Sequence, residues 1–512
     1  MSSWVKKALL LLLAACLLVG VFFVQGSMNL DRDRLGLTRV EPLDNAPPVL
    51  AFTTVALGGF RGLISNALWI RASDLQDDDK YFEMAQLADW ITKLEPHFVQ
   101  VWLVQAWNMA YNISIKFTDF GDRWRWVKRG IELLRDDGLR YNPNETLIYR
   151  ELAWFFQHKL GQNLDDAHMY YKSQWVKEIS EVFGKKTPNL DELIHPQTPD
   201  QRRRRELLIN KFKMDPEMMK EVDERYGPLE WRLPEASAIY WAALGLKKAE
   251  ENPTKIKPDD LITLRRVIYQ SMQLSFQRGR LIENPFLKSF EFGPNLDIIP
   301  KVNAAYEQAE NEDAKNRDHI EKAQRNFLRD AVYFLYEHNR LADAGYWYKY
   351  LGSRFPDKPL LDNITNSLPA SLTLNDYAVD RTQEDISETM SRDRIKSVVE
   401  GLLKRFYESM LLRGEDNHAA GYYHMAEQVL DTYKSKTSMR PDALNIPSIV
   451  QVRTEVLSNL LDPDQGLIPD ARAALRAKLG MPPETTPAPA GNTNAVPDHV
   501  SSPSVASPPE AL

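Results

Sequence analysis

Nine histidines are the main candidates for metal binding or acid–base chemistry in this 512-residue chain, and no His-Glu-x-x-His motif is present. His418 and His424 are six positions apart, a spacing that does not place both rings on one face of a helix. His158 and His168 flank Gly161 and would meet only across a helical hairpin. We therefore predict no metal site and interpret the histidines as surface or packing residues. The nine are His97, His158, His168, His195, His319, His338, His418, His424 and His499.

Motifs for nucleotide binding and for nucleophilic catalysis are also missing. The stretch FGKKTP (183–188) lacks the upstream glycine of a phosphate-binding loop. LGGFRG (57–62) is rich in glycine, but it lies inside an apolar helical pattern and does not follow a strand. No Gly-x-Ser-x-Gly sequence marks a hydrolase serine. The sequence predicts no catalytic residue and no cofactor, and therefore no enzyme.

Two basic stretches were weighed as binding surfaces. Arg202–Arg205 occupy consecutive positions, which point all round a helix, so a solvated helix start is favoured over contact with acidic lipid or an acidic partner. Trp124 and Trp126 alternate with basic residues and could stack on a base or a sugar. They are two positions apart and face different sides, so at least one belongs to a core. A net charge of −7 and a pI near 5.8 argue against a nucleic-acid partner.

The N-terminus carries the clearest localisation signal. Lys6 and Lys7 precede residues 8–24, a run of 17 without charge that is nearly long enough to cross a bilayer. We favour a retained signal anchor over residues 1–27. Cleavage near Val24, and lipidation of Cys16 in a lipobox-like Leu-Ala-Ala-Cys, remain alternatives. The short leader predicts a single-pass protein of the inner membrane with most of the chain on the periplasmic side.

A second apolar stretch covers residues 49–72, after a polar linker over 28–48 that ends in two prolines. Read as a membrane span, it would place Arg61 near the bilayer centre at a cost of about 2.5–3.5 kcal/mol. We interpret it instead as the buried first helix of a soluble domain.

The remaining chain divides into regions that differ in their predicted secondary structure. Residues 49–177 read as helix after helix, 178–300 as an irregular helical middle region, and 301–480 as a second helical region. Residues 481–512 are rich in proline and lack aromatic residues, which predicts disorder. Residues 288–300 could instead form an extended, non-helical segment between helices, an extended excursion. Helices are predicted over 234–249, 261–279, 303–338, 340–355, 392–413 and 417–434.

One pattern is written twice in the first helical region. Pro96 is followed after six residues by Trp102 and after ten by Ala106. Pro143 is followed at the same spacings by Tyr149 and Ala153. A proline outside a helix, a large ring within it and a small residue one turn later suit helical hairpins that stack on each other.

This pattern resembles the tetratricopeptide (TPR) repeat, with an aromatic residue, small residues at close helix contacts and a closing proline. Residues 327–359 resemble it again, with Ala344 and Tyr348 ahead of Pro356, and 402–430 more weakly. The unit from Trp102 to Pro143 is longer than the family's usual 34 residues. The start of the chain also resembles membrane-anchored, TPR-like bacterial proteins of uncharacterised function. The resemblance implies an all-α helical-repeat solenoid with an N-terminal transmembrane helix and a disordered C-terminal tail.

A solenoid of this kind offers an extended surface for a protein or peptide. We therefore expect a membrane-tethered scaffold whose partner binds inner-helix residues. The alternative is a carbohydrate-binding or carbohydrate-processing protein on an α/α scaffold, which as a glycosidase would need two facing carboxylates. The sequence leaves the partner and the oligomeric state open. The candidate contact residues are Asn108, Tyr111, Asn112, Arg150 and Gln157.

Overall fold

The computed structural model describes residues 61–184, 188–251, 258–284, 289–361, 366–384, 392–437 and 447–484, and single residues between 4 and 31. The chain forms two compact units, Met1–Ile113 and Ser114–Leu512. Most of the predicted anchor and linker, the first part of segment 49–72 and residues 485–512 of the predicted tail lie outside the described residues. None of the helices built from described residues combines the length and the apolar character that a membrane crossing requires.

The described residues are mostly helical, which confirms the all-α class at a coarse level. In the first unit, α3 packs against α4, and α4 packs against α5 and the π-helical η2. Ala72 and Leu75 of α3 are buried, whereas Leu63 and Ile70 are exposed. The prediction that 49–72 forms a buried first helix is therefore wrong for its described part, because α3 buries only one face. The elements are α3 (Arg61–Asp77), α4 (Tyr81–Leu94), α5 (Val99–Trp107) and η2 (Asn108–Ile113).

The repeated proline–aromatic spacing has a direct structural meaning. In the first unit, the indole nitrogen of Trp102 donates a hydrogen bond to the carbonyl oxygen of Pro96 at 2.8 Å. In the second unit, the hydroxyl of Tyr149 donates to the carbonyl oxygen of Pro143, also at 2.8 Å. Two different rings thus satisfy the same backbone acceptor, which the proline turn leaves outside the helix.

The likeness of these two segments continues into the backbone. A π-helical stretch begins six residues after the ring in each: η2 after Trp102, and η5 (Phe155–Gly161) after Tyr149. Trp107 stacks on Tyr111 with ring centroids 4.1 Å apart. Trp154 and His158, which are also four residues apart, stack with ring centroids 4.5 Å apart. The small residues Ala106 and Ala153 are both fully buried. The sequence repeat is therefore a repeat of local structure.

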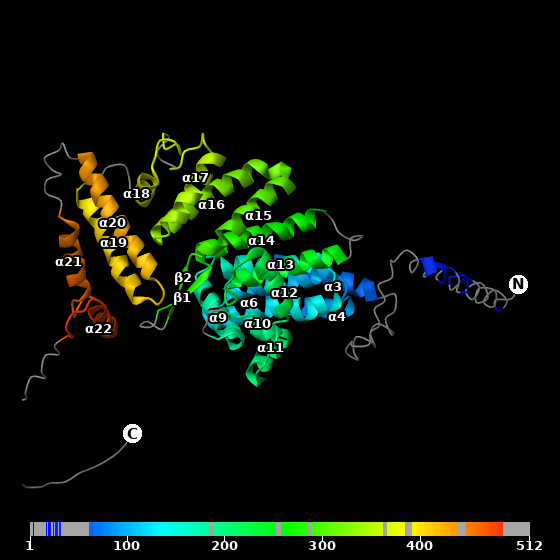
Figure 1. Cartoon of the computed structure of the whole chain (residues 1–512). Coiled ribbons are helices and arrows are strands. Elements are labelled where there is room, and N and C mark those ends of the chain that lie inside the picture. Colours follow the sequence, from blue (N-terminus) through cyan, green and yellow to red (C-terminus); the bar gives the residue numbers. More distant parts are fainter. Residues whose placement is uncertain are drawn as a thin grey trace, which may run out of the picture. The chain divides into compact units, whose positions relative to one another are not determined.

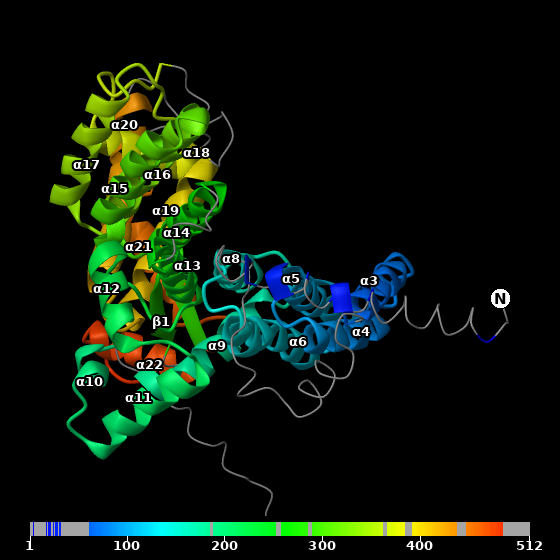
Figure 2. The same ribbon diagram turned by 90° about the vertical axis from the view of Figure 1, so that its right-hand side faces the viewer.

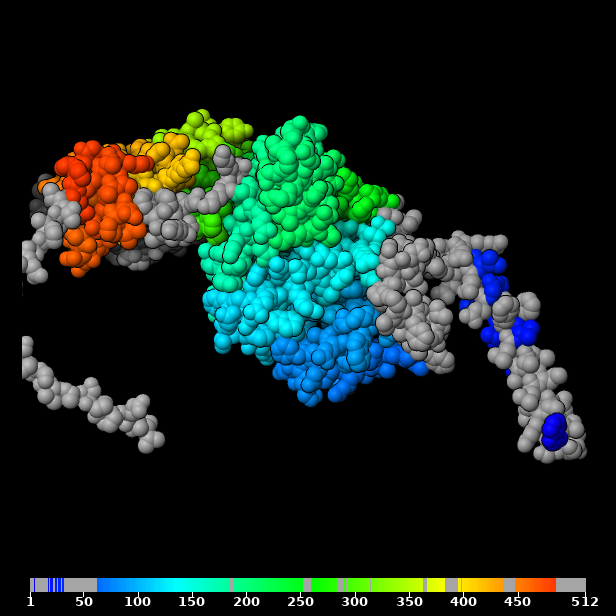
Figure 3. Space-filling view, turned by 90° about the horizontal axis from the view of Figure 1, so that it is seen from below, coloured from blue at the N-terminus to red at the C-terminus, as the bar shows by residue number. Residues whose placement is uncertain are grey.

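The second unit begins with a series of mostly short helices, of which η4 and η5 pack against α8. Its first elements are η3 (Ser114–Lys116), α6 (Phe120–Glu132), η4 (Leu133–Gly138), α7 (Leu139–Tyr141), α8 (Thr146–Trp154), η5 and α9 (His168–Phe183). A group of three helices follows, which Figure 3 shows from below as a green surface. They are α10 (Asp191–Ile194), α11 (Pro199–Lys211) and α12 (Pro216–Tyr226).

The next helices lie side by side in an ordered stack (Figure 1). They are α13 (Pro234–Glu251), α14 (Pro258–Arg278), α15 (Ile299–Glu312), α16 (Arg317–Glu337) and α17 (Leu341–Arg354). The hairpin of α16 and α17 covers most of segment 327–359 but begins ten residues before it, and Figure 2 shows the two helices beside α15. The chain ends with α18 (Leu374–Glu384), α19 (Arg392–Leu411), α20 (Asp416–Thr437), α21 (Ile449–Leu460) and α22 (Pro469–Lys478).

Helix α8 packs mainly against α13, which lies far from it in the sequence, and less against the helices that directly precede or follow it. The contact depends on Gly245, where a Cβ atom would lie 2.7 Å from Cβ of Tyr149. The region 178–300 thus contributes α13 and α14 to the helical stack, so it is not merely an irregular spacer. Tyr149 does lie at a seam between helices, but its neighbour across the seam comes from a distant part of the chain.

Two predictions about the middle of the chain have different outcomes. The extended excursion is confirmed in part, since β2 (Ser289–Gly293) pairs antiparallel with β1 (Arg280–Asn284) before η7 (Leu296–Ile298). The continuous helix predicted over 303–338 is wrong. It is broken at Asp313 and by η8 (Ala314–Asn316), where the carboxylate of Asp313 accepts hydrogen bonds from Asn316 and Arg266. These side-chain bonds compete with the helical backbone.

Candidate functional site

A groove of about 850 Å³ in the second unit runs along one face of α14. We call it the α14 groove. The residues that α14 contributes recur at intervals of three and four, so they form a single face of the helix, opposite the buried Leu264, Ile268 and Met272. This face consists of Ile262, Arg265, Arg266, Tyr269, Gln270, Gln273 and Leu274. The walls come from Trp154, His158, Gln162, Tyr306, Ala309, Glu312, Asp313, Asn316, His319, Ile320 and Ala323.

Charges in the α14 groove are paired with each other. Arg265 lies 3.3 Å from Glu312, and Arg266 lies 2.7 Å from Asp313. The hydrogen bond from Arg266, followed by that from Asn316, lowers the pKa of Asp313. The groove therefore offers no surplus charge of one sign to a ligand.

Three rings of the groove have pKa values shifted toward their uncharged forms. Burial, and then the charge of Lys159, lowers the pKa of His158, which stacks on Trp154. Burial raises the pKa of Tyr269, with a smaller contribution from Glu312. Burial also raises the pKa of Tyr306 to about 12. At neutral pH these side chains provide flat apolar surface together with neutral hydrogen-bonding groups.

Amide side chains complete the surface. Gln157 donates from Nε2 to Oε1 of Gln270 at 3.1 Å and to the carbonyl oxygen of Val267 at 3.3 Å. Tyr306 donates to Oε1 of Gln273 at 3.4 Å. The amide oxygens of Gln270 and Gln273 therefore act as acceptors within the protein. Their NH₂ groups are left to donate to other partners.

The five residues predicted as partner contacts are divided between the two units. Asn108, Tyr111 and Asn112 belong to the first unit, while Arg150 and Gln157 belong to the second. Asn108 is only 1% exposed and donates to the carbonyl oxygen of Tyr81, and Asn112 donates to Asn108. Tyr111 stacks on Trp107, and Arg150 lies 3.3 Å from Glu151.

Gln157 is fully buried, so its effect on the groove is indirect. Asn108 and Gln157 are thus buried amides that link helices, while the role of the set in partner binding stays a prediction. The α14 groove could not be recognised from the sequence, since its walls come from segments that are far apart.

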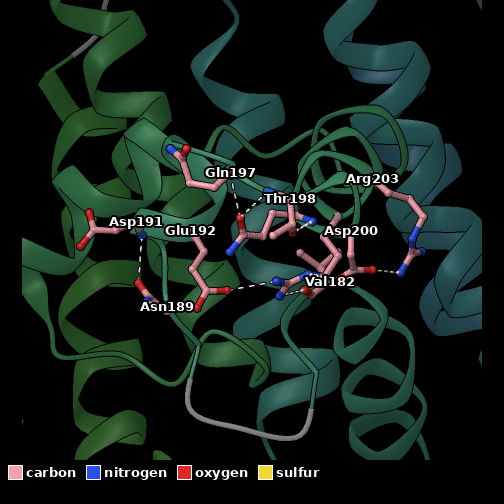
Figure 4. A network of polar contacts seen from close by, with 10 residues as sticks. Val182, Asn189, Asp191, Glu192, Gln197, Thr198, Asp200 and Arg203 are labelled. Atoms are coloured by element: carbon pink, nitrogen blue, oxygen red, sulfur yellow. Dashed lines mark hydrogen bonds and ion pairs between the residues drawn. The ribbon is translucent and has the colours of Figure 1, made fainter.

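The arginine run 202–205 serves the fold. Arg204 donates to the carbonyl oxygen of Val182 at 3.2 Å and pairs with Glu192 at 3.0 Å, and Arg203 pairs with Asp200 (Figure 4). A capping box of Thr198 and Gln201 begins the helix. Of the two tryptophans weighed for stacking, Trp124 is buried, as predicted for at least one of them.

A second pocket, of about 650 Å³, borders a buried cluster of Glu337, His338 and His418. Helix α16 ends at Glu337, and Asn339 adopts a left-handed φ of 57° beyond it, which turns the chain into α17. His418 lies on α20, which crosses close to this turn. The two imidazole rings are stacked with centroids 3.6 Å apart.

Burial disfavours the charged forms of His338 and Glu337. Burial, and then the neighbouring His418, lowers the pKa of His338 to about 3. Burial raises the pKa of Glu337, against smaller opposing effects of His418, Arg405 and a hydrogen bond from Tyr422. His424, the residue considered with His418 at the sequence level, instead contacts the hydroxyl of Tyr336 at 3.1 Å. The sequence missed the His338–His418 pair because the two residues are distant along the chain.

His338 should make stability depend on pH. Between about pH 6.5, the usual pKa of histidine, and pH 3, the unfolded chain binds a proton that the folded chain does not. The stability that neutral, buried His338 contributes is therefore fully present above pH 6.5. Between pH 6.5 and pH 3, the free energy of unfolding falls by about 1.4 kcal/mol for each pH unit of acidification. The raised pKa of Glu337 acts in the opposite sense above its usual value, because the folded chain there holds the extra proton.

Urea unfolding at several pH values, in buffer with a chelator, measures this dependence. The His338→Gln variant should show a shallower loss of stability than the wild type between pH 6.5 and 3. Both proteins should show the same slope between pH 7 and 8. Equal slopes in the acidic window would contradict the assignment to His338.

Comparisons with protein-family models, with curated proteins and with solved structures give no match for this chain.

Proposed function

We propose that this chain is a membrane-tethered, TPR-like helical scaffold, without catalytic activity, that binds an extended segment of a protein or peptide partner in the α14 groove. The observation that carries the proposal is the composition of the groove. Its tryptophan and tyrosine rings are uncharged at neutral pH, its two arginines are already paired with carboxylates, and its glutamines present amide groups. Such a surface suits a neutral peptide, whose backbone can pair with amides while an apolar side chain packs on rings.

The tether is supported by the sequence alone. Lys6 and Lys7 followed by the uncharged run 8–24 favour a retained anchor in the inner membrane, with most of the chain on the periplasmic side. A scaffold fixed at one end in this way would hold its partner near the membrane surface.

The carbohydrate alternative receives no specific support. A glycosidase needs two available carboxylates on either side of the bond that is cleaved. The carboxylates that line the α14 groove are Glu312 and Asp313, and each is paired with an arginine of α14. We therefore place the peptide hypothesis first.

Site-specific photocrosslinking in cells that express the full chain tests the proposal. A photoreactive amino acid replaces Ala323, which is exposed and lines the groove, or Asp318, which is exposed on the same helix and is not a lining residue. We expect a crosslinked protein partner at position 323 and none at position 318. Adding Gln270→Arg, which places a long charged side chain in the groove, should abolish the crosslink. Equal crosslinking at both positions, or no effect of Gln270→Arg, would refute groove binding.

A further inference from the structure

The cluster of Glu337, His338 and His418 has the donor set of a metal site. One possible ligand atom from each of the three residues lies within 4.8 Å of the other two. Within the described part of the chain, this is the group of His, Cys, Asp or Glu residues that meets this criterion. Two imidazole nitrogens and one carboxylate oxygen suit zinc and related divalent transition metals. Calcium and magnesium instead prefer oxygen ligands throughout.

Each imidazole already has the partner that fixes its tautomer. Nδ1 of His338 lies 2.9 Å from the carbonyl oxygen of Phe334, an atom that can only accept, so this nitrogen carries the proton. Nδ1 of His418 lies 3.2 Å from a carboxylate oxygen of Glu415. Both contacts leave Nε2 with its lone pair available. A carbonyl or carboxylate behind the imidazole is the arrangement that usually orients a metal-binding histidine.

The second nitrogen of each ring is unsatisfied within the described part of the chain. Nε2 of His338 and Nε2 of His418 are both buried, and neither has a hydrogen-bond partner among the described residues. His338 is only 4% exposed, so bulk water does not satisfy its ring. Nε2 of His418 lies 4.0 Å from a carboxylate oxygen of Glu337, which is too long for a hydrogen bond.

The surroundings provide both access and charge balance. All three residues border the 650 Å³ pocket, which leaves room for a water molecule or a ligand as the fourth donor. Glu415 is held in turn by an ion pair with Arg280. The imidazole planes are nearly parallel, at 12°, so binding one ion in both planes requires one ring to turn. His418 borders the pocket and is the less buried of the two histidines, so its ring is the one that we expect to turn.

We propose that Glu337, His338 and His418 bind one divalent transition-metal ion, with zinc as the best-suited element, and that Glu415 orients the ring of His418. This site is separate from the α14 groove. Ion binding would join the end of α16 to α20 through three ligands.

Zinc titration of the full chain, purified in detergent and stripped with a chelator, tests the site. Calorimetry should show one Zn²⁺ per chain. His418→Gln should weaken binding by at least about 100-fold, and Glu415→Gln by about 10–100-fold, as expected for the loss of an orienting carboxylate. The matched control is His424→Gln on the same helix, which should bind Zn²⁺ as the wild type does.

Two further measurements keep the test decisive. If His418→Gln fails to fold by circular dichroism, Glu337→Gln, which keeps the side-chain shape, replaces it with the same expected loss. Co²⁺ added to the wild type should give the visible absorption bands of a four-coordinate site, and Glu337→Gln should reduce them. The proposal is overturned if the wild type binds no stoichiometric Zn²⁺, which would leave water as the occupant. It is equally overturned if the ligand variants bind Zn²⁺ as tightly as His424→Gln does.

Discussion

Replacing Gly421 with alanine is expected to lower the free energy of unfolding of the second unit by about 3 kcal/mol, at the upper end of the usual range for overpacking. A Cβ atom at this position would lie 1.7 Å from the carbonyl oxygen of Glu337 and 3.0 Å from the amide nitrogen of Asn339. Both are backbone atoms, so no side chain can move aside. Helix α20 would have to withdraw from the end of α16, which would also separate His418 from His338.

Urea unfolding of the full chain measures this effect, and Gly345→Ala is its control. Gly345 lies within α17, and a Cβ atom there would meet nothing within 4 Å. Because alanine is favoured over glycine inside a helix by about 1 kcal/mol, this variant should be as stable as the wild type or more so. If Gly421→Ala unfolds at the same urea concentration as Gly345→Ala, the close contact of α20 with α16 is refuted.

Asp165→Ala is expected to destabilise the second unit by about 3 kcal/mol, because it removes the carboxylate that faces a buried ammonium group. The side chain of Lys159 is 4% exposed, and its Nζ lies 2.7 Å from Asp165. The same carboxylate accepts hydrogen bonds from the hydroxyl of Tyr171 and from the backbone amide of Ala167 at the start of α9. The substitution therefore removes an ion pair and two hydrogen bonds at once.

The neighbouring residue gives a matched control. Asp166 forms an ion pair with Arg123, but its side chain is 68% exposed. Exposed pairs contribute at most about 1 kcal/mol, so Asp166→Ala should change the urea midpoint only slightly. Similar midpoints for the two variants would show that burial of Lys159 does not strengthen its pair with Asp165.

Local features of the fold could be predicted from residue types and spacing. The aromatic residue six positions after Pro96 and after Pro143 marked a real structural unit, because both rings reach back to the proline carbonyl. The boundaries of α19 and α20 agree with the predicted helices to within three residues, since apolar periodicity reports which face a helix buries.

Features that depend on distant segments could not be predicted. Nothing in the sequence around Tyr149 indicates that Gly245 packs against it. In the same way, His418 was compared with His424 on its own helix, although its ring partner is His338. The break at Asp313 was missed because periodicity continues across it, while the bonds from Arg266 and Asn316 form only in the folded chain.

The two proposed sites lie at opposite ends of one helix. His319 and Ala323, near the start of α16, line the α14 groove, while Glu337 and His338 stand at its end. At about 1.5 Å per residue, roughly 28 Å of helix separates His319 from His338. A ligand confined to the α14 groove would therefore not touch a bound ion, and a substitution at Gln270 should leave Zn²⁺ binding unchanged.

The π-helical stretches at Asn108 and Phe155 have a consequence for how this chain is compared with regular repeats. A π turn holds one residue more than an α turn, and one residue rotates an α-helix by about 100°. Counting in steps of 3.6 from Thr146 therefore assigns the wrong direction to side chains within η5, the stretch that ends this helix and carries Gln157 and His158.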